Sequence, residues 1–143
     1  MQLLQNRWQR TWRLMNLILH DISQAVYTKE MAQELSDMAV KLGKKAKVHI
    51  KIDTGMGRIG FPPTEKTADL IAEIKKFPGI ELEGMFTHFS KADETDKTTT
   101  LEQIRAFLWM KEHLAAEGME FTYYHCANSA STVSYTHLRA HET

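Results

Sequence analysis

The residues best suited to chemistry in this sequence are a lysine and an arginine on either side of a glycine-rich turn. Lys51 belongs to residues 48–53, where apolar and polar residues alternate, so a β-strand here would carry His49 and Lys51 on its polar face. Arg58 follows within residues 55–60, whose glycines let the backbone approach a ligand closely. Its planar guanidinium binds a carboxylate or a phenolate through paired hydrogen bonds. The pattern indicates a site for such a ligand, although a plain surface strand would also alternate in this way.

Two further strand-like segments also end in polar side chains. Thr87 and His88 close one of them, and His125, Asn128 and Ser129 close the next. In folds with parallel strands, ligands bind at the carboxyl ends of the strands. Asn128 and Ser129 can also begin a helix, where free backbone N–H groups bind phosphate. Three successive polar strand ends therefore predict a ligand site at one rim of the sheet.

Each of these residues also has a structural alternative. His88 and His125 can be histidines with satisfied hydrogen bonds inside a barrel, and Lys51 can pair with a nearby carboxylate. Asn128 and Ser129 are more often a helix cap than a phosphate site. No metal site is predicted, because the histidines lie far apart in the sequence and no cysteine pair accompanies them.

Strand and helix patterns alternate along the chain from residue 21. Apolar residues at helical spacing follow the predicted helix caps Thr28 and Thr64, and a third helical run ends at Gly118. The predicted strands lie at residues 22–27, 48–53, 82–89 and 121–127. This alternation predicts an α/β fold with parallel strands and outer helices, either a doubly wound sheet or part of a (β/α) barrel.

Length and composition exclude several classes of function. The chain has 143 residues, which is the size of one domain. Its net charge is zero, so the composition lacks the excess of positive charge that is typical of nucleic-acid binding. It has one cysteine and no apolar run long enough to span a bilayer. We expect a cytoplasmic protein without disulfides, without a nucleic-acid partner and without a membrane span.

Three motifs, in this order, resemble those of one enzyme family. Residues 48–61 are similar to the signature of the alanine racemases, the fold type III enzymes that use pyridoxal 5'-phosphate. Residues 84–93 resemble the next strand of that family, and residues 125–130 resemble the strand after it. The resemblance covers residues 21–132 and implies about half of a (β/α)8 TIM-type barrel, as an internal fragment of the N-terminal cofactor-binding domain.

The resemblance implies a role for each matching residue. Arg58 matches the arginine that reaches the substrate carboxylate and the phenolic side of the cofactor. Lys51 matches a lysine that is often carbamylated. Carbamylation replaces the positive charge of Lys51 with a negative one, so the pair of Lys51 and Arg58 would change from repulsive to attractive. The residues that match the cofactor-binding positions are His88 beside the pyridine ring, Ser129 at the phosphate, and Asn128 and His125 as its neighbours.

The resemblance also implies the interconversion of L-alanine and D-alanine by a homodimer, which supplies D-alanine for peptidoglycan. The cofactor lysine and the catalytic tyrosine of the family match nothing in this sequence, so we expect the chain as written to be inactive. Three alternatives stay open. They are a pyridoxal-phosphate homeostasis protein, a racemase for serine or another small amino acid, and a remnant without ligand.

The two ends of the chain do not follow the family pattern. Residues 1–20 place apolar side chains on one helical stripe with arginines off it, which is typical of a packing helix or a membrane-surface helix; we favour the former. They match the family poorly, and we hypothesise that they come from a shifted reading frame. Residues 133–143 resemble a translated sequencing adaptor, so we assign no function to their His137, Arg139 and His141.

Overall fold

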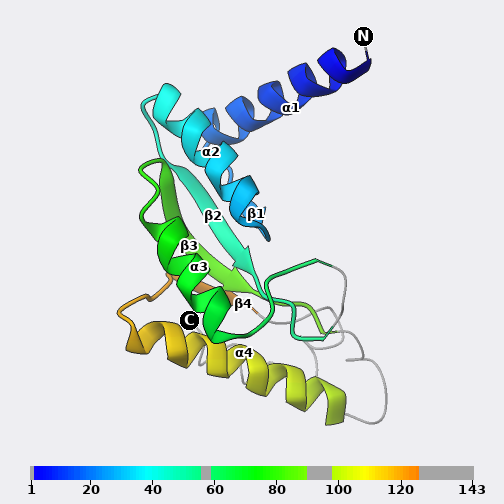
Figure 1. The fold of residues 1–143 in the computed structure, drawn as a ribbon, viewed down its shortest axis with the longest axis vertical. Coiled ribbons are helices and arrows are strands. Elements are labelled where there is room, and N and C mark those ends of the chain that lie inside the picture. The colour runs from blue at the N-terminus through cyan, green and yellow to red at the C-terminus, as the bar shows by residue number, and fades with distance from the viewer. Residues whose placement is uncertain (1, 56–58, 90–97, 126–143) are drawn as a thin grey trace.

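The computed structural model describes residues 2–55, 59–89 and 98–125 (Figure 1). Helices and strands alternate through most of these ranges. The helices are α1 (Gln2–Leu19), α2 (Lys29–Lys41), α3 (Glu65–Lys75) and α4 (Thr98–Ala116). The strands are β1 (Gln24–Val26), β2 (Ala46–Lys51), β3 (Ile80–Phe86) and β4 (Tyr123–His125).

The four strands form one parallel sheet in the order β1-β2-β3-β4. Each strand pairs with the strand before it in the chain, with Ile50 opposite Val26 on one side and Met85 on the other. A doubly wound sheet changes strand order at its centre, whereas a barrel keeps sequential order throughout. The sheet is therefore about half of a (β/α) barrel, which confirms the predicted fold class.

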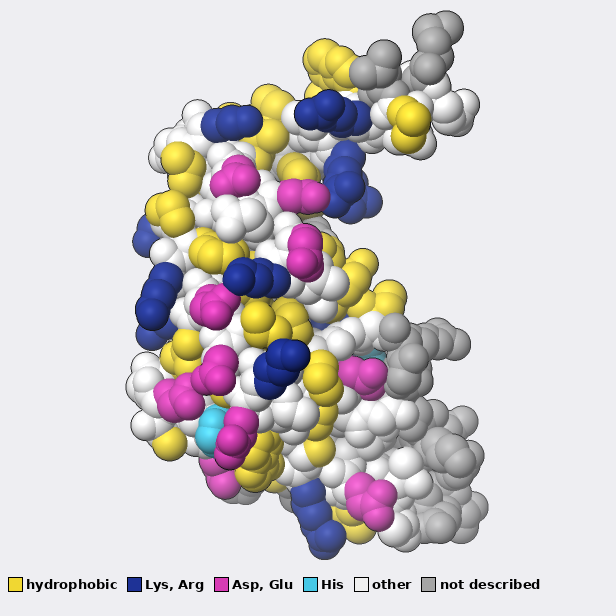
Figure 2. Space-filling view, in the orientation of Figure 1, with side chains coloured by type: hydrophobic (Ala, Val, Ile, Leu, Met, Phe, Trp, Pro, Cys, Tyr) yellow, Lys and Arg dark blue, Asp and Glu magenta, His cyan; other side chains and the backbone are white. Residues whose placement is uncertain are grey.

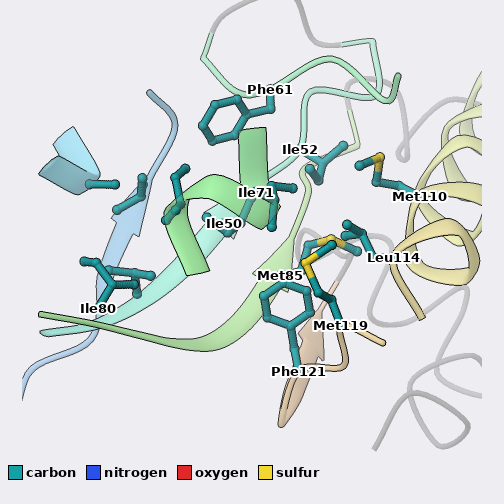
Figure 3. Packing of buried hydrophobic residues seen from close by; sticks show 14 of the residues in the cluster. Ile50, Ile52, Phe61, Ile71, Ile80, Met85, Met110, Leu114, Met119 and Phe121 are labelled. Atoms are coloured by element: carbon teal, nitrogen blue, oxygen red, sulfur yellow. The ribbon is translucent and has the colours of Figure 1, made fainter. Parts of the chain in front are cut away.

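One face of the sheet forms the hydrophobic core beneath the helices. Val48 and Ile50 on β2 are fully buried, whereas His49 and Lys51 on the opposite face are only partly buried. The helices contribute large buried side chains to the same cluster, and Figure 3 shows Leu114 of α4 beside Met85 and Met110 near Ile52. Apolar burial on one face leaves the other face available for polar side chains.

Local sequence signals define the ends of the helices. The Thr28 hydroxyl accepts a hydrogen bond from the backbone N–H of Met31 at 3.2 Å, and Thr64 does the same for Thr67 at 3.2 Å. Both threonines have extended backbone angles, as helix N-caps require. Gly43 follows α2 with a φ of 66°, a left-handed conformation that suits glycine. The predicted caps are confirmed.

The structure differs from the prediction at α1. The helix forms, but Trp8 and Trp12 of the predicted packing stripe are 73% and 62% exposed, whereas Ile18 is buried. Arg10 in the middle of α1 pairs with Glu34 of α2, the carboxyl-terminal end of α1 reaches the body, and its amino-terminal end extends away from the body (Figure 1). The packing face therefore follows the neighbours that α1 meets and not the strongest apolar stripe. None of the described helices is long and apolar enough to cross a bilayer.

Candidate functional site

Three of the predicted site residues lie at the same edge of the sheet. Lys51 is the last residue of β2, His125 is the last residue of β4, and His88 lies just beyond the end of β3. Phe86 is opposite Lys51 on one side and His125 on the other, so the three strand ends stand at one level. The other predicted residues lie outside the described ranges, and their placement stays a prediction: Arg58, Asn128 and Ser129.

The strand that leads to His88 is shorter than predicted. β3 ends at Phe86 and not at Phe89, and its last residue pairs with His125 of β4. One more backbone hydrogen bond joins the two segments, from the Thr87 N–H to the His125 carbonyl at 3.1 Å. Beyond it, the Thr87 hydroxyl is hydrogen-bonded to the Thr54 hydroxyl at 2.9 Å, so the chain after β3 is tied to the chain after β2.

Phe86 supports both histidines, a role that the sequence analysis missed. The His125 ring stacks on the Phe86 ring with a centroid distance of 4.7 Å and an interplanar angle of 3°. The His88 ring meets the same phenyl ring edge-on at 5.7 Å. The available signal was the register, because a residue paired with Lys51 points to the same face as Lys51.

The environment of His88 favours its neutral form. Partial burial of the imidazole beside Phe86 lowers its pKa, and the positive charge of Lys51 lowers the pKa further. The residue as a whole is exposed, so the desolvation concerns the ring side that packs on Phe86. His88 therefore stays uncharged to lower pH than a free histidine does.

A Lys51→Gln variant should raise the pKa of His88, because it removes the neighbouring cation and leaves the burial in place. Titration of the His88 ring by NMR measures the change. Lys51→Arg keeps the charge and should preserve the low pKa. Lys47→Gln is a second control, because Lys47 lies at the other end of β2 and pairs with Asp21 at 2.8 Å. An unchanged His88 pKa in Lys51→Gln would contradict the assigned cause.

The loop after β2 returns to the sheet and is held there by backbone hydrogen bonds. The Asp53 N–H donates to the Phe61 carbonyl at 2.8 Å, and the Phe61 N–H donates to the Lys51 carbonyl at 2.9 Å. Gly60 has a φ of 146°, and a Cβ there would lie 2.8 Å from the Asp53 nitrogen. Glycine is therefore required where this loop closes. Both flanks of the segment that contains Arg58 are anchored at the site edge.

A carboxylate that the sequence analysis missed also lies on the inner face. The pairing of β2 with β3 shifts after Val48, so that Val48 is opposite Leu82 but His49 is opposite Gly84. Glu83 is the extra residue of this bulge, and its carboxylate reaches His49 Nε2 at 2.9 Å. Strict alternation would have placed Glu83 on the core face with Met85.

The other surface features of the described residues are weaker candidates for a functional site than this edge of the sheet. A hollow of about 540 Å³ lies between α1 and α2, and its Arg10 pairs with Glu34 at 2.6 Å. The described residues contain no group of histidine, cysteine and acidic side chains that could hold a metal ion. On the face shown in Figure 2, side chains of both charges are mixed, which does not resemble a nucleic-acid surface.

Comparison with known proteins gives consistent matches. Residues 3–143 match the model of the alanine racemase N-terminal domain. The alanine racemase of Clostridium perfringens strain ATCC 13124 is 52% identical over 116 residues, which are 81% of this chain and 30% of that protein. That of Clostridium tetani is 45% identical over 119 residues, 83% of this chain and 31% of that protein.

Solved structures agree with these relatives. The alanine racemase of Clostridium difficile 630 in complex with cycloserine superimposes with a TM-score of 0.86 at 40% identity. The match covers 90% of this chain and 35% of that one. The chain thus spans about a third of the length of the proteins it resembles.

Proposed function

We propose, because this chain belongs to the alanine racemase family, that it forms the cofactor-binding half-barrel of an enzyme that interconverts L-alanine and D-alanine. The observation that carries the proposal is the meeting of Lys51, His88 and His125 at one carboxyl edge of a parallel sheet. Such edges are where barrel enzymes bind their ligands.

The chemistry of this edge fits pyridoxal 5'-phosphate, which is a planar ring with a phenolate and a phosphate. His88 and His125 offer imidazoles on a phenyl support, and Lys51 offers an amine. Ser129 and Asn128 would hold the phosphate, and Arg58 would face the phenolate. When bound, this cofactor supplies an electron sink for the negative charge left on an amino-acid α-carbon.

Racemisation removes the α-proton from one side of alanine and returns it from the other. Arg58 would bind the alanine carboxylate with its guanidinium fork and so fix which bond faces each base. Carbamylation would turn the Lys51 ammonium into an anion that orients Arg58. Neutral His88 would form hydrogen bonds beside the ring. We assign neither proton-transferring base to a residue of this chain.

The same proposal extends to the setting of the enzyme. We propose a homodimer in the cytoplasm that supplies D-alanine to the cell wall, with residues 21–132 as the part of the chain that belongs to the barrel. A single cysteine in 143 residues fits a reducing compartment. Genomic sequence on both sides of this chain tests the boundaries, and genomic codons for residues 133–143 would refute an adaptor origin.

The first test is binding of pyridoxamine 5'-phosphate to the 143-residue chain, followed by NMR. This compound has the ring and phosphate of the cofactor but cannot bond covalently to a lysine. We expect saturable shifts at Lys51, His88 and His125, and none at His113 on α4. Absence of binding, or shifts confined to the hollow around Arg10, would overturn the proposed cofactor site.

The second test is the conversion itself. The product of the complete reading frame that contains this chain is incubated with pyridoxal 5'-phosphate and L-alanine, and D-alanine is measured. We expect D-alanine to appear only with cofactor present. Cofactor binding without racemisation of alanine would instead favour a homeostasis-type barrel protein or a racemase for another amino acid.

A further inference from the structure

We propose that Glu83 and His49 are positioning residues that fix the orientation and the tautomer of His125 at the cofactor edge. The proposal rests on the proposed function only for the identity of the ligand that His125 faces. The chain of contacts runs across the inner face of the sheet, from Ser23 beside β1, through Glu83 on β3 and His49 on β2, to His125 on β4.

The chain begins at an ionised carboxylate. The Ser23 hydroxyl donates a hydrogen bond to Glu83 Oε2, and this bond is the main cause that lowers the pKa of Glu83; His49 and Lys47 lower it further. Glu83 therefore stays ionised until the pH falls through this lowered pKa. An ionised carboxylate only accepts hydrogen bonds. His49 Nε2, at 2.9 Å from Glu83 Oε2, must carry the proton between them.

The second contact, between His49 and His125, determines which nitrogen of His125 carries the proton. A neutral imidazole that is protonated at Nε2 has a lone pair at Nδ1. His49 Nδ1 lies 3.3 Å from His125 Nε2, so His125 must donate from Nε2 to complete the contact. The Nδ1 atom of His125 is then an acceptor and not a donor. If His49 also carried a proton at Nδ1, that atom would donate to His125 Nε2, and His125 would have to carry its own proton at Nδ1. The position of the proton on one ring therefore determines its position on the other.

The packing around the two rings holds them in this arrangement. A Cβ at residue 84 would lie 2.7 Å from His49 Nδ1, so the His49 ring occupies space that only a glycine leaves open. Tyr123 stacks on the other side of His49, with a centroid distance of 6.2 Å and an interplanar angle of 20°. Phe86 stacks on His125. The bulge in β3 points both Glu83 and Gly84 at His49.

The network has a consequence for ligand binding at the edge. A histidine with a fixed tautomer offers a ligand a ring nitrogen with one defined role, donor or acceptor. A ring whose tautomers exchange freely offers the same nitrogen in both roles. Glu83 and His49 are 18% and 19% exposed at their side chains, so the contact between them is partly shielded from water, whereas His125 is exposed. Glu83 thus acts on the ligand through two intervening rings without touching it.

NMR of the cofactor-free 143-residue chain tests this inference directly. We expect the ring protons on Nε2 of both His49 and His125, and a nitrogen–nitrogen coupling across the His49–His125 hydrogen bond. A ring proton on Nδ1 of either residue, or the absence of that coupling, would overturn the inference. This measurement needs no variant and no ligand.

Variants then separate positioning from bulk stability. Glu83→Leu should abolish the coupling and the protected His49 proton, and should weaken pyridoxamine 5'-phosphate binding by about fivefold, the net worth of one hydrogen bond. Ser23→Ala should cause a smaller loss of both. Unchanged His113 resonances, on the distant helix α4, would show that the variant is folded. A Glu83→Leu protein that keeps the coupling would contradict the inference.

The two proposals can fail separately. If the coupling is present but pyridoxamine 5'-phosphate does not bind, the network stands and the proposed cofactor site is wrong. If the compound binds at Lys51, His88 and His125 but no coupling is found, the cofactor site stands and the positioning role is wrong.

Discussion

A Phe107→Ala variant should lose about 3–5 kcal/mol of unfolding free energy, which is the usual cost of removing a buried phenyl ring. Phe107 is fully buried on α4 and belongs to the cluster that joins this helix to the sheet. The same helix buries Leu114 beside Met85 and Met110 near Ile52 (Figure 3). The loss is measured by urea unfolding followed by far-ultraviolet circular dichroism.

Trp109→Ala on the same helix is the matched control. Trp109 is 41% exposed, and its ring stacks on His113 at 5.0 Å. Its removal takes away a surface contact and leaves no internal cavity, so we expect a loss of about 1 kcal/mol or less. Equal losses in the two variants would mean that α4 does not pack on the sheet through Phe107.

A Gly79→Ala variant should also be strongly destabilised, by about 3 kcal/mol, at the upper end of the cost of overpacking. A Cβ at this position would lie 2.3 Å from the Ser36 carbonyl oxygen and 2.8 Å from Ser36 Cα, both backbone atoms of α2. The Gly79 N–H also donates to Ser36 Oγ at 3.0 Å, and its carbonyl accepts from Ala46 at 2.7 Å. Relief of the clash would therefore move α2 away from the starts of β2 and β3.

Gly118→Ala provides the comparison for Gly79. Gly118 has a φ of 81°, but nothing lies within 4 Å of an added Cβ, so only backbone strain of about 1–2 kcal/mol opposes the change. Denaturant midpoints of both variants give the difference. A Gly79→Ala protein as stable as Gly118→Ala would show that α2 is not packed tightly on the turn before β3.

The parts of the fold that were predicted correctly are those that local physics determines. Alternation along β2 separated the core residues Val48 and Ile50 from the inner-face residues His49 and Lys51, because side chains of a strand point to opposite faces in turn. Threonine at the two helix caps was recognisable for the same reason, since the hydroxyl satisfies backbone donors within the same segment.

The features that were missed depend on contacts between distant segments. The bulge at Glu83 exists only in the pairing of β3 with β2, and alternation within β3 alone would give the wrong face for this residue. The packing face of α1 depends on where α2 and β2 contact this helix. These contacts determine that Ile18 is buried and Trp12 is exposed. The support of two histidines by Phe86 likewise requires the register of three strands.

The candidate site was predictable in part. Parallel strands place their carboxyl ends together, so a common edge for Lys51, His88 and His125 followed from the fold class, and the structure has this arrangement. The proposed cofactor did not follow from physical reasoning about these side chains. It came from the order and content of three sequence motifs, and the roles of Arg58, Asn128 and Ser129 still depend on that resemblance.

The strictly sequential order of the four strands also has a consequence for synthesis on the ribosome. Each strand that emerges finds its pairing partner already made, because β2 needs only β1, β3 needs only β2, and β4 needs only β3. Growth can thus proceed unit by unit from the amino terminus, without waiting for a distant segment to be translated. Vectorial folding of this kind leaves one newly exposed sheet edge at every stage, and that moving edge is where a nascent chain of this design most needs protection from its neighbours.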